Sequence, residues 1–255
     1  MEKHLLRSGL FADIPAVTAA FTTRHAPDGI AHGDLGYDLG TNTETDADTR
    51  RAHQAALLRA LDFHAQADPA DVLVLAGQVH GADVETVAAA GIYRERDALV
   101  TSQPGLLLAI QVADCAPVLL ADPVARVVGA AHSGWRGTVA NIAARTVVAM
   151  QHLGAEPSRM RAYVGPCISQ THFEVGPEVA AQFDERFVTM PSPGAKPHVD
   201  LKGVLRAQLV GAGLDEAHLH IDPGCTVADN DRFFSYRAEK GQTGRMLGVI
   251  GLREG

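Results

Sequence analysis

The segment LLLAIQVADCAPVLLADPVARVVGAAHSGWRG, residues 106–137, contains three apolar runs of β-strand length. The runs cover residues 106–112, 118–121 and 127–131, and Gly, Pro or Asp residues bound them. A fourth run of this kind covers residues 72–76. Short apolar runs between turn-forming residues are typical of buried strands, so we expect four such strands here.

Helices and further strands follow in irregular alternation. After a tight turn at residues 133–138, apolar residues recur at helical spacing from Val139 to Leu153 and stop before Gly154. Further helices are predicted at residues 175–187 and 201–210, and further strands at residues 160–164, near Leu219 and at residues 246–252. Some strand pairs are too close in sequence to enclose a crossover helix, which predicts an α/β protein with a mixed sheet.

Length and composition are those of an ordinary globular protein. The 255 residues are 46% apolar and 20% charged. Residues 190–197, MPSPGAKP, indicate a surface loop and not a linker, so we expect one domain spanning residues 1–255. Residues 24–48 are rich in Gly, Asp, Thr and His and lack periodicity, which predicts a long functional loop.

Charge and cysteine content restrict the partners and the compartment. The net charge of −8 and the dispersed basic residues argue against a nucleic acid polymer, whereas one arginine and a few backbone amides suffice for a small phosphate ligand. Cys115, Cys167 and Cys225 give no disulfide framework. Residues 1–17 lack the apolar core of a secretory signal, and no segment suits a membrane span. We therefore expect a cytoplasmic protein.

Three residues with metal-binding or nucleophilic side chains lie beside the apolar runs. His80, Cys115 and His132 each follow or end such a run, so adjacent strands would bring them to one sheet edge. Three protein ligands with an open fourth position form the catalytic zinc pattern. The same residues suit a cysteine hydrolase, with Cys115 as nucleophile and His132 as base. Taken singly, each is also explained as a core or surface residue. Taken together, with Asp114 beside Cys115 and Gly or Ser beside each histidine, they favour a functional site. The sequence does not separate the metal from the nucleophile, and of the two we favour the metal.

The turn after His132 is a candidate anion site. Backbone amides at a helix N-terminus and the guanidinium of Arg136 would hold a phosphate, with Gly134 and Gly137 allowing close approach. The alternative is that the glycines only shape the turn and Arg136 forms a structural ion pair.

Two further histidine patterns are weaker. His218 and His220 alternate as on one strand face and would form a two-ligand metal site, although such pairs are usually surface residues. His172-Phe173-Glu174 and Pro166-Cys167 share elements with the zinc deaminase signature, but their order is reversed and Gln170 stands at the second cysteine position. That deaminase fold is therefore not predicted.

Several separated motifs resemble the YfiH/laccase-domain family, also described as polyphenol oxidase-like, purine nucleoside phosphorylase-like and peptidoglycan editing factor proteins. The matching stretches begin at Gln78 (QVHGADV), Ala113 (ADCAPVLLAD), Gly129 (GAAHSGWRG), Val164 (VGPCISQTHFEVGPEV) and Phe233 (FFSYRAEKGQTGR). The resemblance runs from Phe21 nearly to the C-terminus. It implies an α/β, α+β-like sandwich of the YfiH/CNF type, with a mixed β-sheet core covered by helices.

The resemblance also implies an enzyme of purine nucleosides. The implied reactions are phosphorolysis of adenosine, inosine and methylthioadenosine to free base and (methylthio)ribose 1-phosphate, and adenosine deamination. The implied metal is zinc, with copper possible, on His80, Cys115 and His132. We assign catalysis to Cys115, His132 and Arg136, and the substrate and phosphate contacts are expected at Arg24, Gly134, Arg136, Arg237 and Arg245. The expected partners are a purine nucleoside and phosphate, with a monomer or a homodimer equally compatible.

Alternatives remain from other classes. The family's older description favours a copper-dependent polyphenol oxidase, and Cys115 with His132 would suit a hydrolase that edits cell-wall precursors. A non-enzymatic metal-binding protein would close the site with a fourth ligand. The chain departs from the family pattern at residues 36–40, where Asp38 replaces Asn, and at Tyr236, where His is common. These departures point to an altered substrate preference.

Overall fold

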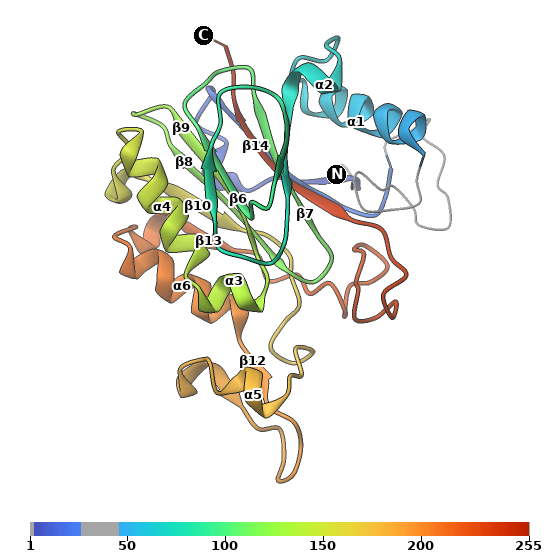
Figure 1. Cartoon of the computed structure of the whole chain (residues 1–255), viewed down its shortest axis with the longest axis vertical. Coiled ribbons are helices and arrows are strands. Elements are labelled where there is room, and N and C mark those ends of the chain that lie inside the picture. The colour runs from blue at the N-terminus through green and yellow to red at the C-terminus, as the bar shows by residue number, and fades with distance from the viewer. Residues whose placement is uncertain (1–2, 27–45, 255) are drawn as a thin grey trace.

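The computed structural model describes residues 3–26 and 46–254, and these residues form two mixed six-stranded β-sheets (Figure 1). The strand order of the first sheet is β1 (Leu5–Leu6), β2 (Val17–Thr22), β14 (Met246–Leu252), β7 (Leu107–Val112), β3 (Leu73–Gly77) and β5 (Gly91–Arg94). That of the second is β13 (Leu219–Ile221), β10 (Arg161–Val164), β8 (Ala116–Asp122), β9 (Val127–Ser133), β6 (Ala98–Thr101) and β4 (Val84–Thr86). Both sheets contain parallel and antiparallel pairs, which confirms the predicted mixed pairing.

The two sheets pack face to face around the main apolar core. Phe21, Ile110 and Ile250 of the first sheet belong to one buried cluster with Leu119 and Val128 of the second. Successive residues of a strand point to opposite faces. The next residues along β8 and β9 therefore face away from this core, toward the helices.

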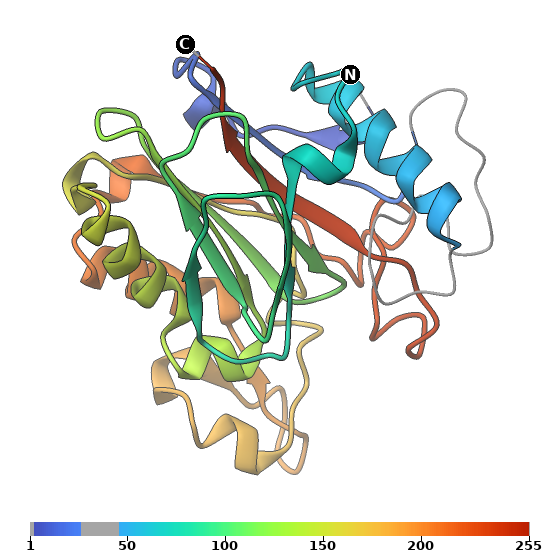
Figure 2. The ribbon, with the colours of Figure 1, turned by 45° about the horizontal axis from the view of Figure 1, so that its top comes forward.

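Helices cover the outer face of each sheet, as Figures 1 and 2 show. On the first sheet, Leu57 and Leu61 of α1 (Ala47–Leu61) pack against Leu107. On the second sheet, α4 (Ile142–His152) and α6 (Leu201–Gly211) pack on Val118 and Ala131. The order helix, sheet, sheet, helix is the predicted α/β sandwich.

Shorter elements complete the described chain. They are α2 (Pro69–Val72), α3 (Trp135–Val139), α5 (Pro177–Ala180), β11 (Val188–Thr189), β12 (His198–Val199) and the 3-10 turns η1 (Gly9–Phe11), η2 (Pro157–Arg159), η3 (Glu185–Phe187) and η4 (Glu216–His218). Residues 190–197 form a largely exposed loop between β11 and β12, as predicted. No helix in the described ranges has the length and apolar character needed to cross a bilayer.

Two predicted helices differ from the structure. The helix predicted at residues 175–187 is wrong: α5 is one turn long, and Asp184 caps a separate 3-10 turn by accepting the Arg186 N–H. The helix predicted from Val139 is interrupted at Asn141, which has a left-handed φ of 60° and separates α3 from α4. The predicted loop at residues 24–48 falls mostly on residues 27–45, outside the described residues, as does the departure at Asp38.

The sheet ends determine where the site lies. β3 and β7 pair in parallel, so their C-terminal ends meet at one edge. Residues 113–115 then connect β7 directly to β8 of the other sheet, and Ala116 at the start of β8 lies opposite Ser133 at the end of β9. The apolar runs therefore converge at an edge shared by two sheets and not, as we expected, at the edge of one.

Candidate functional site

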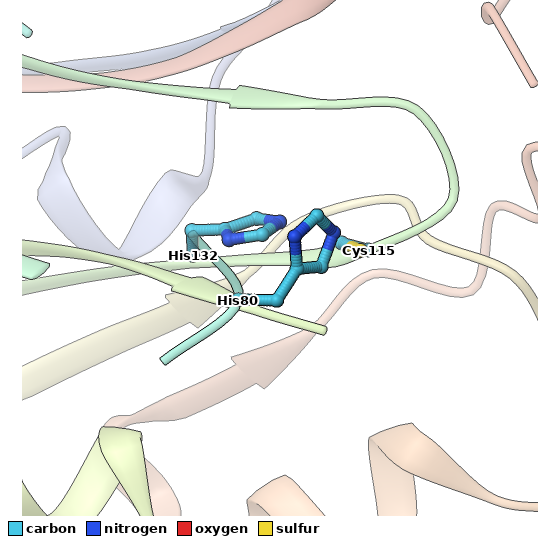
Figure 3. Close-up of side chains that lie close together, drawn as sticks. All are labelled: His80, Cys115 and His132. Carbon is cyan, nitrogen blue, oxygen red and sulfur yellow. The ribbon is translucent and has the colours of Figure 1, made fainter. Parts of the chain in front are cut away.

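His80, Cys115 and His132 come together at this shared edge (Figure 3). His80 follows β3, Cys115 precedes β8, and His132 is on β9. One ligand atom from each residue lies within 4.8 Å of the others, and the two imidazole rings meet edge to face with centroids 4.9 Å apart. His132 is buried, Cys115 is partly buried and His80 is exposed. The predicted convergence of the three residues is therefore present in the structure.

A buried carboxylate, Asp97, organises two of these residues. Its Oδ2 accepts the backbone N–H groups of Val79 at 3.1 Å and Gly81 at 2.7 Å, and its Oδ1 accepts that of His80 at 3.0 Å. His80 has a left-handed φ of 61°, which this bonding supports. Asp97 Oδ1 also accepts a hydrogen bond from Nδ1 of His132 at 2.8 Å.

The donor set fits a metal ion. Zinc bonds to nitrogen and sulfur are about 2.0–2.3 Å long, so the ligand atoms of a tetrahedral site lie about 3.3–3.8 Å apart. The three ligand atoms lie within 4.8 Å of one another, so metal binding would draw them together by at most about 1–1.5 Å. Because Nδ1 of His132 donates to Asp97, its Nε2 carries the lone pair for a metal. A carboxylate behind a ligating histidine is the usual support of such sites.

The charges of the cluster stabilise one another. Burial acts to raise the pKa of Cys115, but the charge of His132 and hydrogen bonds from both histidines outweigh it and lower the pKa to about 6. Burial acts to lower the pKa of His132, but the Cys115 thiolate and Asp97 raise it to about 9. Without a metal, the favoured state is therefore a thiolate beside an imidazolium.

Two glycines of the following turn provide room for the cluster. A Cβ on Gly134 would lie 3.0 Å from Cδ2 of His80 and 3.1 Å from Sγ of Cys115. A Cβ on Gly137 would lie 2.8 Å from the carbonyl oxygen of Gly81. The backbone of Gly134 is extended, with φ −73°, so its role is steric and not conformational.

A cavity of about 460 Å³ opens onto the cluster. Polar and aromatic groups dominate its wall. The lining residues are Gln78, His80, Gln111, Ala113, Asp114, Cys115, His132, Ile168, Phe173, Tyr236, Arg237 and Arg245. Gln78 bridges the ends of β3 and β7, because its amide donates to the Gln111 carbonyl at 2.8 Å and accepts the Gln111 N–H at 2.7 Å.

Asp114 connects the cluster to the segment that carries two of the lining residues. Its Oδ1 accepts the hydroxyls of Thr226 at 2.6 Å and Ser235 at 2.7 Å, and its Oδ2 accepts the backbone N–H of Arg237 at 2.7 Å. Asp114 itself has a positive φ of 87°. These bonds place Tyr236 and Arg237 beside Cys115.

The predicted phosphate contacts divide into two groups. Arg237 and Arg245 line the cavity, whereas Arg24 and Arg136 do not. Arg24 bonds to the Asn230 carbonyl and to Glu239.

Arg136 is exposed, and its guanidinium stacks on the Trp135 ring at 4.4 Å. Gly134 lies beside His80 and Cys115 of the candidate metal cluster, where a Cβ would meet both side chains. Substrate and phosphate binding by these four arginines and by Gly134 remains a prediction.

The weaker histidine candidates lie elsewhere. His218 ends η4 and His220 is on β13, where its Nδ1 pairs with the Ser8 hydroxyl, so the two do not share one strand. Among the described residues, His80, Cys115 and His132 form the one group suited to a metal.

Sequence reasoning missed Asp97 altogether. The one sequence signal for Asp97 is its position directly before the apolar run that forms β6. Asp114 stands out in the sequence only as the neighbour of Cys115, and its bonds to residues far along the chain give no local pattern.

Comparison with known proteins places the chain in a family. A family model described as multi-copper polyphenol oxidoreductase laccase matches residues 18–253. A protein of Deinococcus radiodurans named purine nucleoside phosphorylase is 46% identical over 94% of this chain and 92% of its own length. A protein named adenosine deaminase RL5, from an unknown prokaryotic organism, is 40% identical over 55% of this chain and 56% of its own.

The crystal structure of the hypothetical protein YfiH from Bacillus licheniformis has the same fold. Its TM-score is 0.88 at 28% identity, and the match covers 99% of this chain and 97% of that one. The enzyme names of the relatives confirm the prediction that the chain is an enzyme. The chain therefore belongs to the multi-copper polyphenol oxidoreductase laccase family, the laccase-like YfiH family that its motifs resemble.

Proposed function

We propose that this chain is a zinc-dependent purine nucleoside enzyme that cleaves adenosine, inosine and methylthioadenosine with phosphate and also deaminates adenosine. The names of its relatives support both reactions. The observation that carries the proposal is that the His80–Cys115–His132 cluster and two arginines, Arg237 and Arg245, line one cavity. Such a cavity can hold a nucleoside and an anion together. These small molecules are the proposed partners, and the cytoplasm is the proposed location.

Phosphorolysis needs the phosphate and the ribose to meet in this cavity. A phosphate oxygen bonds to C1′ while the bond from C1′ to the purine nitrogen breaks, which yields the free base and ribose 1-phosphate. Arg237 and Arg245 would hold the phosphate through charge-assisted hydrogen bonds. The exposed ring of Tyr236, also in the cavity wall, offers a stacking surface for the purine.

The residues around Cys115 would position the two histidines that bind the metal. When bound, zinc supplies a Lewis acid that stabilises negative charge on the reacting group. Asp97 holds His132 in one tautomer and fixes the backbone that presents His80. In deamination, water adds at C6 of adenine and ammonia leaves, and the same cavity would enclose both.

Two other functions have specific support. The lowered pKa of Cys115 beside His132 favours a cysteine hydrolase acting on cell-wall precursors. Two histidines and a cysteine also suit copper, in line with the family description. Activity that survives a chelator but is lost on thiol alkylation would favour the hydrolase, and oxygen uptake on phenols after copper loading would favour the oxidase.

The deciding experiment is product analysis with protein of known metal content. Adenosine and inosine are incubated with and without phosphate, and the products are separated chromatographically. We expect free base only when phosphate is present, inosine from adenosine in either case, and loss of both reactions in Cys115→Ala. A metal-free Cys115→Ala protein with full activity would contradict the proposal.

A further inference from the structure

A second thiol cluster lies behind the cavity wall. Cys167 follows β10 and Cys225 follows β13, and the parallel pairing of these two strands continues to them as an isolated bridge. The Thr226 N–H donates to the Cys167 carbonyl at 3.3 Å, which holds the two segments side by side. Both thiols are buried and free.

The bridge places the two cysteines at disulfide range. Neighbouring strands lie about 4.7–4.9 Å apart, within the Cα separation of about 4.4–6.8 Å that a disulfide spans. Directly paired residues of two strands also carry their side chains on the same face of the sheet. The backbone pairing therefore places Cys167 and Cys225 within the Cα separation that a disulfide spans.

The surroundings distinguish the two thiols. Sγ of Cys225 accepts the Ser169 N–H at 3.3 Å and lies 3.5 Å from Nδ1 of His172, a partly exposed residue. Burial acts to raise the pKa of Cys225, but the hydrogen bonds from Ser169 and nearby backbone groups lower it below its usual value. Burial instead raises the pKa of Cys167 to about 12. Cys225 is thus the better nucleophile of the two.

We infer that Cys225 is an oxidation site for hydroperoxides and that Cys167 is its resolving thiol. The Cys225 thiolate attacks one peroxide oxygen, the O–O bond breaks, and a sulfenic acid forms while the other oxygen leaves as an alcohol or water. The Cys167 sulfur then attacks Sγ of Cys225, which forms the disulfide and releases water. Two thiols lose two electrons in all, and one hydroperoxide accepts them.

Oxidation of Cys225 also favours the later attack by Cys167. Burial is the main cause of the raised pKa of Cys167, and the negative charge of Cys225 adds to it; conversion to the neutral sulfenic acid removes this smaller contribution. Lys202, whose charge acts in the opposite direction on Cys167, stays in place through bonds to the Asp222 and Gly224 carbonyls. The resolving thiol therefore becomes easier to ionise once Cys225 is oxidised.

Both thiols adjoin the cavity wall. The N–H of Ile168, next to Cys167, donates to the Asp114 carbonyl at 2.9 Å, and the hydroxyl of Thr226, next to Cys225, donates to the Asp114 carboxylate. The His172 carbonyl also accepts a hydrogen bond from the Arg237 guanidinium at 3.1 Å. The oxidation site is thus connected to the active-site cavity but does not depend on the function proposed for it.

The test is a map of cysteine oxidation in the reduced full-length protein. Samples treated with hydrogen peroxide are blocked with N-ethylmaleimide, digested without reductant and analysed by mass spectrometry. We expect a Cys167–Cys225 cross-linked peptide in the wild type. In Cys167→Ala we expect a Cys225 sulfenic acid trapped by dimedone, and in Cys225→Ser a reduced Cys167. In His172→Phe the cross-link should form several-fold more slowly.

Cys115 provides an internal reference. If Cys167 and Cys225 both remain reduced at peroxide doses that oxidise Cys115, the inference is wrong. A disulfide between Cys225 and Cys115 would overturn the role of Cys167. The wild-type map decides these points even if a variant fails to fold.

Discussion

Asp97 accepts a hydrogen bond from Nδ1 of His132 at 2.8 Å while the same carboxylate accepts the backbone N–H of His80. One buried group thereby orients His132 on β9 of the second sheet and the backbone of His80, which follows β3 of the first. Burial acts to raise the pKa of Asp97, but the hydrogen bonds from His132, Gly81 and Val79 and the charge of His132 lower it, so the carboxylate stays ionised. One buried carboxylate thus links the residues of the candidate metal cluster across the two sheets.

The variant Asp97→Asn should lose metal affinity. The amide cannot stabilise charge on His132, and replacing such supporting groups costs about 10–100-fold in affinity. Zinc competition with a chromophoric chelator measures the change. Asp122→Asn is the matched control, since Asp122 is equally buried on β8 but bonds to Val124, Ala125 and Arg159. It should lower the free energy of unfolding by about 1–3 kcal/mol and leave zinc affinity unchanged.

Adding one methyl group to Gly134 should disturb the cluster directly. In Gly134→Ala the new Cβ presses on His80 and Cys115, and overpacking of this kind costs about 1–3 kcal/mol. We expect weaker zinc binding together with a lower melting temperature. Gly211→Ala, at the end of α6 where a Cβ meets nothing within 4 Å, should leave zinc binding unchanged. Equal zinc affinities in the two variants would refute the steric role.

Much of the sandwich could be predicted because its strands are short apolar runs. The run at residues 106–112 became β7 and the run at 127–131 became part of β9, and each leads to a site residue at its end. The division into two sheets could not be predicted. Three residues link β7 to β8, and only tertiary packing shows that this short link crosses between layers.

The role of Asp97 in the site could not be predicted from the sequence either. Asp97 follows Arg94-Glu95-Arg96, a charged stretch that in sequence resembles any solvated turn. Its four hydrogen-bond donors belong to residues 79–81 and 132, so its one local signal, a position directly before the apolar run of β6, does not reveal its role. The helix predicted at residues 175–187 was wrong because Asp184 accepts the Arg186 N–H and starts a separate 3-10 turn after the single turn of α5.

Substitutions of the arginine in the cavity wall, Arg237, and of the arginine outside it, Arg136, should affect the KM for phosphate differently. Arg237→Gln removes a cation from the cavity wall, so the KM for phosphate should rise about tenfold or more, the value of one charge-assisted hydrogen bond. Arg136→Gln, outside the cavity, should change this KM by less than about twofold. Steady-state phosphorolysis of inosine measures both. The reverse ranking would favour the anion site predicted at the turn after His132.

Alkylation of the metal-free protein should reveal the Cys115 thiolate. Because the pKa of Cys115 is lowered to about 6, the thiolate is present above that pH and is lost as the pH falls through it. The iodoacetamide rate at Cys115, followed by mass spectrometry, should therefore have its midpoint near pH 6. His132→Asn should move the midpoint toward about 8.5, the usual thiol value.

Cys167, whose pKa burial raises to about 12, should stay unlabelled at neutral pH and serves as the internal reference. Zinc should protect Cys115, and a wild-type midpoint near 8.5 would show that His132 does not stabilise the thiolate.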